Sequence, residues 1–423
     1  MKLTLSLLLS VAPAFLHAAD WPQYRGPNAN GSSSDKIQKT WPDAGPRQVW
    51  KTPLTAGFST FAVADGKAFT LVSRTFDSVK NDVCLALDAA SGKELWAASL
   101  GYTKYDGGGD DGAPDNRGGD GPRSTPSVDG NRVYVLSGGL TLWCLDSGTG
   151  KPVWKKDLVK EHGARNITWQ GAASPLIEGN SIFVCAGGAG QSLLCFNKTT
   201  GALVWKAEND AMTHVTPVAA TILGQRQVLF FTQAGLVSVA PGNGQVLWRY
   251  TFPYRTSTAA SPVVGGDIVF CSAGYGVGAG AVKISKEGSG FKATELWRKQ
   301  NQLINHWSSS VYRDGHVYGL FGFKQWQKVP LKCIDIATGD EKWSMDGFGQ
   351  GGTILVDGSL VTLAENGELV VVDAVPDAYR ETARVKAVTG KCWNSPAVAG
   401  GRIYARSTKE GVCLDVSGKM TAK

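Results

Sequence analysis

Short apolar runs separated by glycine-rich turns recur along most of the chain. In the clearest copy, residues 133–136 (Val-Tyr-Val-Leu) and 142–145 (Leu-Trp-Cys-Leu) are rich in β-branched and aromatic side chains, a composition that favours strands. Asp-Gly-Asn and Gly-Gly segments join such runs, as in tight hairpins. Asp146 can then accept bonds from its own backbone, and Gly150 can adopt a positive φ, so a further turn is expected. The pattern predicts many short antiparallel strands and no long helix.

This unit recurs eight times. The opening strands of the eight copies begin at Ser59, Ser124, Ala173, Thr216, Ser261, Ser309, Gly352 and Ser395. Most copies close with an Asp-like residue followed eight positions later by Trp, as in Asp146 and Trp154. The fifth copy stretches this spacing between Ser285 and Trp297, and the seventh, after Asp373, has no Trp. A period of about 46 residues is the signature of a repeat fold.

One four-stranded unit cannot bury both faces of its own sheet, whereas radial packing of several sheets buries them all. The predicted fold is therefore an all-β, eight-bladed β-propeller. The last copy stops before its own Trp strand, and residues 47–54 match the outer strand at 151–158. We therefore expect the N-terminal strand to complete the C-terminal blade and close the ring. Seven blades are the alternative if the copy at Gly352 forms no blade.

Composition and the N-terminus narrow the class of protein. The chain has 53 Gly and 14 Trp among 423 residues, with only 19% charged residues, which excludes a long disordered chain. The net charge of +7 is spread thinly, so no nucleic-acid partner is expected. Lys2 and an apolar stretch from Leu3 to Leu16 predict a signal peptide at residues 1–19.

This export signal sets the expected compartment and the division of the chain. No cysteine lies near the cleavage site, so a lipid anchor is not expected. No later apolar stretch is long enough to span a membrane. We expect a periplasmic or secreted protein. The remainder divides into an extended segment at 20–44, the propeller at 45–418 and a disordered tail at 419–423.

The eight cysteines fall mostly at equivalent positions of the repeat, such as Cys84 and Cys144. Such positions are spread around a ring and cannot approach to disulfide distance, so they are interpreted as small buried apolar residues. Cys185 and Cys195 flank a glycine-rich turn, and a bond between these two is left open.

The unit resembles the pyrroloquinoline-quinone (PQQ)-like repeat. Asp-x-x-(Thr/Ser)-Gly-Lys-x-x-Trp, preceded by (Ser/Thr)-Pro-x-Val-x-Gly-x-(Val/Ile)-(Tyr/Phe), carries the likeness over about residues 45–418. The family includes quinoprotein dehydrogenases that use PQQ and Ca²⁺, a non-catalytic lipoprotein of the outer-membrane β-barrel assembly machinery, and exported proteins of unassigned role. The segments at 21–27 (Trp-Pro-Gln-Tyr-Arg-Gly-Pro), 121–126, 347–352 and 392–396 look most like the third group. The resemblance implies that the repeat tryptophans pack between blades: Trp50, Trp96, Trp154, Trp205, Trp248, Trp297 and Trp343.

Two sets of residues are candidates for ligand binding. The positions just before each innermost strand should line one mouth of the central channel, and they are Arg123, Trp169, Gln170, His214, Arg255, Asn305, His306, Gln350, Trp393 and Asn394. The two arginines favour a small anionic ligand. A glycine-rich segment carries five carboxylates that are weak candidates for Ca²⁺: Asp106, Asp110, Asp111, Asp115 and Asp120. The alternative is a solvated insertion.

The dehydrogenase branch fits the sequence poorly. The chain has no two adjacent cysteines, no Cys-x-x-Cys-His haem site and no Glu-Asn-Asp ligand set at the blade starts. We therefore predict a monomeric binding or scaffolding module for a protein or envelope component, with no assigned catalytic residue. A PQQ- and Ca²⁺-dependent oxidoreductase is the alternative, and a glycan-binding propeller is the third.

Overall fold

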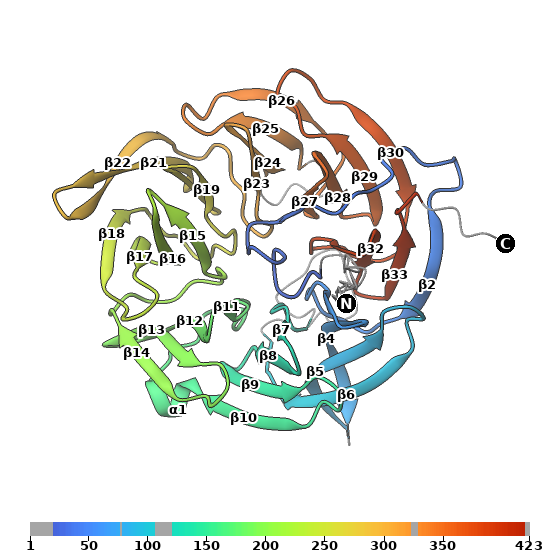
Figure 1. Ribbon diagram of the computed structural model, residues 1–423, viewed down its shortest axis with the longest axis horizontal. Coiled ribbons are helices and arrows are strands. Elements are labelled where there is room, and N and C mark those ends of the chain that lie inside the picture. The colour runs from blue at the N-terminus through green and yellow to red at the C-terminus, as the bar shows by residue number, and fades with distance from the viewer. Residues whose placement is uncertain (1–19, 77, 106–120, 323–328, 419–423) are drawn as a thin grey trace, which may run out of the picture.

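The computed structural model describes residues 20–76, 78–105, 121–322 and 329–418, and these form eight sheets around a central axis (Figure 1). The prediction of an all-β, eight-bladed propeller is confirmed, and the copy at Gly352 forms a blade. The predicted signal peptide, the five candidate Ca²⁺ aspartates and the predicted tail lie outside the described residues. Within the described residues, no helix is long and apolar enough to cross a membrane.

Each blade is an antiparallel sheet whose first strand faces the channel. Blade 1 contains β3 (Ala62–Ala64), β4 (Lys67–Phe76), β5 (Val79–Asp88) and β6 (Glu94–Gly101). Blade 2 contains β7 (Ser127–Asp129), β8 (Arg132–Leu136), β9 (Thr141–Asp146) and β10 (Pro152–Asp157). Blade 3 contains β11 (Leu176–Glu178), β12 (Ser181–Gly188), β13 (Gln191–Asn197) and β14 (Leu203–Ala207). Blade 4 contains β15 (Val218–Ile222), β16 (Gln225–Thr232), β17 (Gly235–Val239) and β18 (Val246–Thr251).

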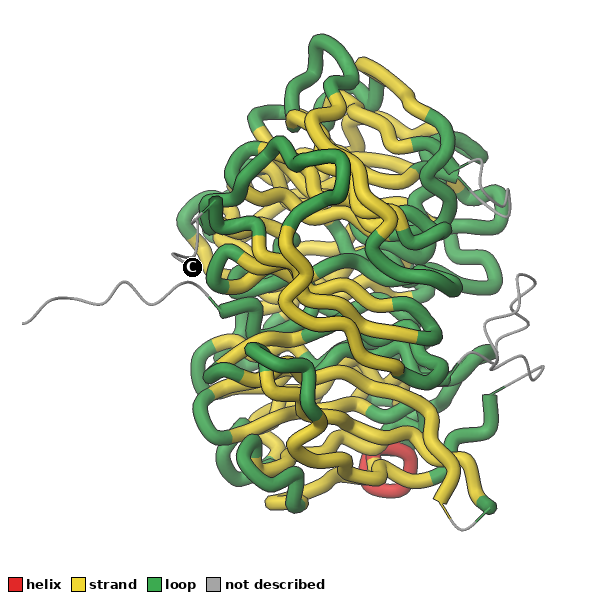
Figure 2. The backbone as a smooth tube through the Cα atoms, turned by 90° about the vertical axis from the view of Figure 1, so that its right-hand side faces the viewer, coloured by secondary structure: helices red, strands yellow, loops and turns green. Residues whose placement is uncertain are grey.

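The second half of the ring repeats this order. Blade 5 contains β19 (Val263–Gly265), β20 (Ile268–Ala273), β21 (Gly278–Glu287) and β22 (Gly290–Lys299). Blade 6 contains β23 (Val311–Arg313), β24 (His316–Leu320), β25 (Leu331–Asp335) and β26 (Glu341–Met345). Blade 7 contains β27 (Gly352–Val356), β28 (Ser359–Leu363), β29 (Glu368–Asp373) and β30 (Glu381–Lys386). Strands fill most of the side view in Figure 2, with the short helix α1 (Leu158–His162) in red.

Blade 8 closes the ring with strands from both ends of the chain. It contains β31 (Ala397–Ala399), β32 (Arg402–Arg406), β33 (Glu410–Asp415) and the N-terminal β2 (Arg47–Pro53), which pairs with β33 as predicted. At the joint with blade 1, the fully buried Arg406 donates to Thr70 Oγ1 at 2.8 Å, to the Leu71 carbonyl at 2.7 Å and to the Thr55 carbonyl at 3.0 Å. These charge-assisted bonds satisfy a guanidinium that would otherwise be costly to bury.

Every outer strand carries a β-bulge at the same place. In blade 2 the pairing of β10 skips Val153, and Trp154 then opposes Cys144. The skipped residues in the eight blades are Val49, Leu95, Val153, Val204, Leu247, Leu296, Lys342 and Thr382. A bulge re-aims the side chains around it, and in seven blades the residue after the bulge is the repeat tryptophan.

The repeat tryptophans join each blade to the next. Trp96 Nε1 donates to the Ser147 carbonyl of blade 2 at 3.1 Å, and Gly150 of the same turn lies against the indole. Gly150 has φ +71°, and a Cβ added there would lie 2.6 Å from Cε3 of Trp96. Equivalent glycine–tryptophan pairs are Gly92–Trp50, Gly201–Trp154, Gly244–Trp205 and Gly339–Trp297. The Thr-Gly-Lys motif therefore needs glycine for two reasons: the turn requires a positive φ, and the indole of the preceding blade leaves no room for a Cβ.

Trp248 departs from this rule because blade 5 departs from the repeat. The β21–β22 hairpin is stretched and lacks the Asp-x-x-Thr-Gly turn that would offer a carbonyl. Trp248 Nε1 instead donates to Gln227 Oε1 within its own blade at 2.7 Å. Its ring is still buried against blade 5, in a cluster that includes Val282 and Ile284.

Hydroxyl groups at the blade starts link neighbouring inner strands. Thr60 N donates to Thr125 Oγ1 at 3.1 Å, Thr125 N to Ser174 Oγ at 2.9 Å, and Ser174 N to Thr216 Oγ1 at 2.9 Å. An equivalent bond joins blades 5 and 6, where Ser261 N donates to Ser309 Oγ at 2.9 Å. This chain of bonds explains the recurring Ser or Thr at the start of the unit, and blade 7 interrupts it because Gly352 has no hydroxyl.

The N-terminal strap, residues 20–46, runs across the middle of the ring (Figure 1). Trp21 exchanges two backbone bonds with Val63 of blade 1, at 2.9 and 2.8 Å, and is almost fully buried. The Pro22 carbonyl accepts from Val128 N of blade 2 at 2.7 Å. Each residue at the start of the strap is therefore fixed to a different inner strand.

The strap continues over blades on the other side of the ring. Gln23 Oε1 accepts from Ile177 N of blade 3 at 3.1 Å, and Arg25 Nη2 donates to the Ser310 carbonyl of blade 6 at 2.8 Å. Burial lowers the pKa of Arg25 to about 10. β1 (Ser32–Ser33) then pairs in parallel with β27 of blade 7, and Gln38 N donates to the Val416 carbonyl of blade 8. The strap thus contacts six blades at one end of the channel.

All eight cysteines are free and buried. In the β12–β13 hairpin, Cys185 lies opposite Leu193 and Cys195 lies opposite Phe183, so the two thiols do not face each other. Burial raises the pKa of Cys185 to about 12.

Candidate functional site

The residues predicted to line a mouth lie at the end of the channel away from the strap. Successive strands of a blade run in opposite directions, so the segments before each inner strand share one face with the loops between second and third strands. The strap contacts the opposite ends of its strands, because β1 pairs with Leu355 and Val356 at the end of β27 and Gln38 N donates to the Val416 carbonyl just after β33. The mouth and the strap therefore occupy opposite faces of the ring.

The first group at this mouth is centred on Trp169. Its ring stacks on Tyr275, with centroids 6.2 Å apart and planes 17° apart, and lies 6.4 Å from the ring of His214. Arg123 Nη1 donates to the Trp169 carbonyl at 2.7 Å. Trp169 and Gln170 both have positive φ, at +69° and +65°, a backbone conformation that costs about 1–3 kcal/mol per residue outside glycine.

His214 is held between two loops in its neutral form. Its Nε2 lies 3.0 Å from the Thr168 carbonyl, and its Nδ1 lies 2.8 Å from Ser257 Oγ. Burial, together with the positive charge of Arg123, lowers the pKa of His214 to about 4. The ring therefore stays neutral at physiological pH and can bond on both sides without an added charge.

The second group is centred on Trp393. Its ring stacks on Trp307, with centroids 4.6 Å apart and planes 16° apart, and on Phe58 at 5.2 Å and 23°. Lys391 Nζ lies 4.6 Å from the Trp393 ring centroid, and Glu365 Oε1 accepts from Trp393 Nε1 at 2.8 Å. One indole therefore contacts two aromatic rings, a cation and a carboxylate.

His306 connects the two groups. Its ring meets Tyr275 edge-on at 5.3 Å and lies 5.0 Å from Trp307. The aromatic contacts thus run without a break from Trp169 to Trp393 along the mouth. The sequence prediction missed Tyr275 and Glu365 because it considered only the segments before inner strands, whereas both residues follow second strands.

The predicted amides have different surroundings. Asn305 Nδ2 donates to the Leu320 carbonyl at 2.8 Å, inside its own blade. Asn394 is 7% exposed and Gln350 is 5% exposed, yet within the described part of the chain neither Asn394 amide atom nor Gln350 Nε2 has a hydrogen-bond partner. Arg255 is exposed, whereas Arg123 donates to the Trp169 carbonyl. The binding of a small anionic ligand by Arg123 and Arg255 together stays a prediction.

A buried carboxylate lies behind the first group. Asp82 is 1% exposed and accepts from Tyr105 Oη at 2.9 Å and from Thr103 Oγ1 at 2.8 Å. Burial raises the pKa of Asp82 in spite of these bonds, which act in the opposite direction. The guanidinium of Arg123 lies 5.1 Å from the Tyr105 ring centroid, so the carboxylate, the phenol and the cation form one network.

The combination of tryptophan-docked blades and a closed ring agrees with sequence comparison. A family described as outer membrane protein assembly factor BamB matches residues 79–319. The chain belongs to this BamB family. A curated relative, the outer membrane protein assembly factor BamB of Moranella endobia (strain PCIT), is 24% identical over 266 residues, which cover 59% of this chain and 64% of the relative. The chain thus spans less than two thirds of that relative's length.

Solved structures of the same architecture include BamB and quinohemoprotein alcohol dehydrogenase. BamB from Moraxella catarrhalis shares 15% identity with a TM-score of 0.60, over 89% of this chain and 99% of that chain. Quinohemoprotein alcohol dehydrogenase from Comamonas testosteroni shares 15% identity with a TM-score of 0.62, over 96% of this chain and 81% of that chain. At these identities the likeness shows the fold alone, and the resemblance to PQQ-like repeats is confirmed.

The described residues do not fit the Ca²⁺ and quinone set of a dehydrogenase. Among residues 20–76, 78–105, 121–322 and 329–418, no three His, Cys, Asp or Glu side chains converge as metal ligands. Glu365, the carboxylate of the Trp393 group, accepts from Trp393 Nε1 and from Gln350 N. Asn305 is turned into its blade. We therefore derive no redox step for this BamB-family propeller.

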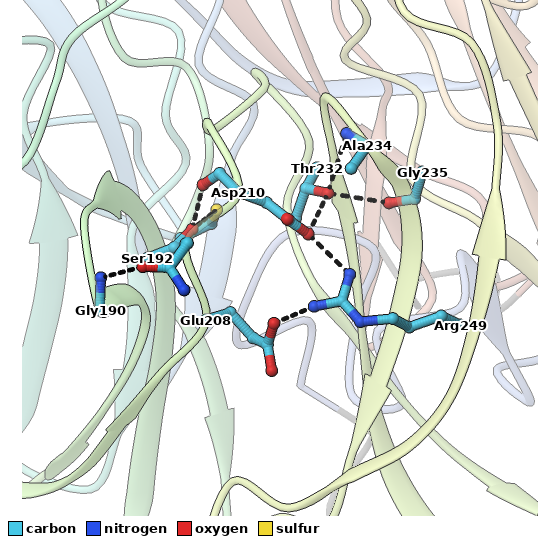
Figure 3. Close-up of polar contacts among 10 residues, drawn as sticks. Gly190, Ser192, Glu208, Asp210, Thr232, Ala234, Gly235 and Arg249 are labelled. Atoms are coloured by element: carbon cyan, nitrogen blue, oxygen red, sulfur yellow. Dashed lines mark hydrogen bonds and ion pairs between the residues drawn. The ribbon is translucent and has the colours of Figure 1, made fainter.

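The rim beside blades 3 and 4 is held by a charged network on the same face (Figure 3). Arg249 bonds to Glu208 and, at 2.9 Å, to Asp210, both in the loop that leads to His214. Thr232 Oγ1 donates to Asp210 Oδ2 at 3.0 Å. This loop of the propeller is therefore fixed to blade 4 before any partner binds.

Proposed function

We propose that the protein is an exported binding or scaffolding module of the cell envelope that acts in BamB-like assembly of outer-membrane proteins. The observation that carries the proposal is the match of residues 79–319 to the BamB family. The fold supports it, because a closed ring of eight sheets is a rigid platform for loops. The protein partner is placed on the face that carries the mouth, since the strap covers the channel on the other face.

Loops on the mouth face are pre-organised, which lowers the entropy cost of association. Arg249 fixes the loop with Glu208 and Asp210, and His214 bonds two loops at once. A partner docking there would order few further side chains. The proposal includes a monomeric chain, released from its signal peptide into the periplasm.

Site-specific photo-crosslinking in cells tests this proposal. A photo-reactive residue would replace Gln170 on the mouth face and, as the matched control, the exposed Gln225 at a turn on the strap face. We expect a discrete adduct with an envelope protein from position 170 and none from position 225. A strain without the protein should contain less folded barrel protein in its outer membrane. The absence of adducts from position 170, or unchanged barrel protein levels, would contradict the proposal.

A further inference from the structure

The outer edge of blade 1 lacks a protection that the other seven blades have. Each blade has an outer strand that pairs on one side only, which leaves a row of backbone groups on its other side without a strand partner. Lys and Arg side chains on such edges discourage pairing with another chain. β6, all of whose residues are described, contains neither, and Ala97 directly follows its repeat tryptophan. The other seven outer strands each contain Lys or Arg, and in six of them it occupies the position of Ala97: Lys51, Lys155, Lys206, Arg249, Arg298 and Arg384.

The edge of β6 is also apolar. Between bulges at Leu95 and Leu100, residues 96–99 pair with β5 in regular register, and residues 97–99 are Ala, Ala and Ser. Leu95 is 46% exposed, and Tyr102, just beyond the end of the strand, is 61% exposed. An edge of this kind is suited to an extended segment of another protein, in which main-chain hydrogen bonds provide affinity and side-chain pockets provide specificity.

A cleft of about 610 Å³ borders this edge, where blades 1 and 2 are neighbours in the ring (Figure 1). Its volume lies within the range of about 300–1,000 Å³ that is typical of ligand sites. Residues 99–101 of β6 form one wall, and the facing wall includes Trp143 of β9, Lys155 of β10 and two residues of α1. A strand added to β6 would therefore place side chains from one of its faces in the cleft.

Blade 2 departs from the repeat inside this cleft. Trp143 lies opposite Lys155 in the sheet and is only partly buried. At the equivalent position, five other blades have aliphatic residues that are fully buried: Leu85, Leu194, Val237, Val370 and Val412. The large indole is thus not required by the packing of the repeat. Nζ of Lys155 lies 4.9 Å from its ring centroid, a contact that favours a cation.

The charge of Lys155 is not neutralised by a carboxylate. Lys156 pairs with Glu161 at 3.3 Å, and Lys160 pairs with Asp157 at 3.2 Å. Among the described residues, Lys155 forms no ion pair. The cleft therefore has one positive charge available, and charge complementarity favours an acidic side chain in a partner.

We propose that an extended strand of a partner protein pairs with the edge of β6 and places an acidic side chain in the cleft beside Lys155. Main-chain bonds to β6 hold the strand, while Trp143 and Lys155 select its side chains. The inference does not rest on the proposed function, because the edge lies on the outer rim rather than at the mouth of the channel and fits any protein with such a strand.

Binding is tested with the full mature chain and a fluorescein-labelled peptide, Ser-Val-Thr-Glu-Thr-Val-Ser. In an extended conformation both Val side chains share one face with Glu, as Trp143 and Lys155 require. We expect saturable binding by fluorescence anisotropy. Hydrogen–deuterium exchange should slow in residues 94–101 and stay unchanged in residues 203–207, the outer strand of blade 3. The same peptide with Pro in place of both Thr should not bind, because Pro cannot donate to the ladder.

The outcomes of these measurements are decisive. An absence of saturable binding would overturn the proposal. Binding that leaves exchange in residues 94–101 unchanged, or that protects residues 203–207 equally, would also overturn it.

Charge reversal tests the cleft separately from the edge. Lys155→Glu should weaken binding of the acidic peptide by about two- to fivefold, the range for an exposed ion pair, and strengthen binding of the peptide with Lys in place of Glu. Lys206→Glu is the matched control, because Lys206 is exposed at the same position of blade 3. It should leave both affinities unchanged. Equal effects of the two substitutions would refute the placement of the acidic side chain beside Lys155.

Discussion

The contact between each turn glycine and the preceding tryptophan predicts how the blades respond to one added methyl group. At Gly150 a Cβ would lie 2.6 Å from Cε3 and 2.8 Å from Cδ2 of Trp96, closer than carbon atoms can pack. Such overpacking costs about 1–3 kcal/mol, and a positive φ at a residue other than glycine adds about 1–2 kcal/mol. Gly150→Ala should therefore lower the free energy of unfolding by about 3 kcal/mol.

Gly130 provides the matched control for this substitution. It has φ +53°, in the β7–β8 turn of the same blade, and a Cβ added there meets nothing within 4 Å. Gly130→Ala should therefore cost only the backbone strain, about 1–2 kcal/mol. Urea unfolding followed by tryptophan fluorescence measures both variants. Equal losses for the two variants would show that the Trp96 contact does not limit how the blades dock.

Three further predictions concern buried groups. The pKa of His214 is about 4 in the folded protein and near 6.5 when unfolded, so the unfolded chain binds the extra proton first. The free energy of unfolding is therefore at its full value above pH 6.5 and falls by about 3 kcal/mol towards pH 4, which urea unfolding at a series of pH values measures. If a His214→Gln variant showed the same pH dependence, this prediction would be wrong. Trp21→Ala should cost about 3–5 kcal/mol in urea unfolding, because this strap residue is only 1% exposed. The thiols of Cys185 and Cys392 should react with a thiol reagent only after unfolding, since burial raises both pKa values to about 12.

The repeat could be predicted from sequence because its residues recur for local physical reasons. Residues equivalent to Trp96 and Gly150 recur because the indole of one blade packs against the turn of the next, where only glycine leaves enough room. Closure was also predictable, since residues 47–54 supply the outer strand that the last copy lacks. The path of the strap could not be predicted, because its hydrogen bonds join residues such as Trp21 and Val63, which the repeat pattern does not relate.

The mouth was predicted only in part. Positions before the inner strands, such as Trp169 and Trp393, follow from the repeat register, and the structure brings each into an aromatic group. Their partners Tyr275 and Glu365 come from loops between second and third strands, whose lengths differ from blade to blade. The eightfold pattern therefore located the channel but could not show which side chains meet there.

Departures from the repeat coincide with the group centred on Trp393 at the mouth. The recurring tryptophans and glycines dock blades and close turns, so in most blades these side chains are already engaged in the fold. Blade 7 lacks both the repeat tryptophan and, at Gly352, the hydroxyl that links inner strands, yet it provides Gln350 and Glu365. Blade 8 adds Trp393 beside them. Because natural sequences break their own local rules mainly where function requires it, the sector between blades 7 and 8 is where selection for binding is expected to have acted.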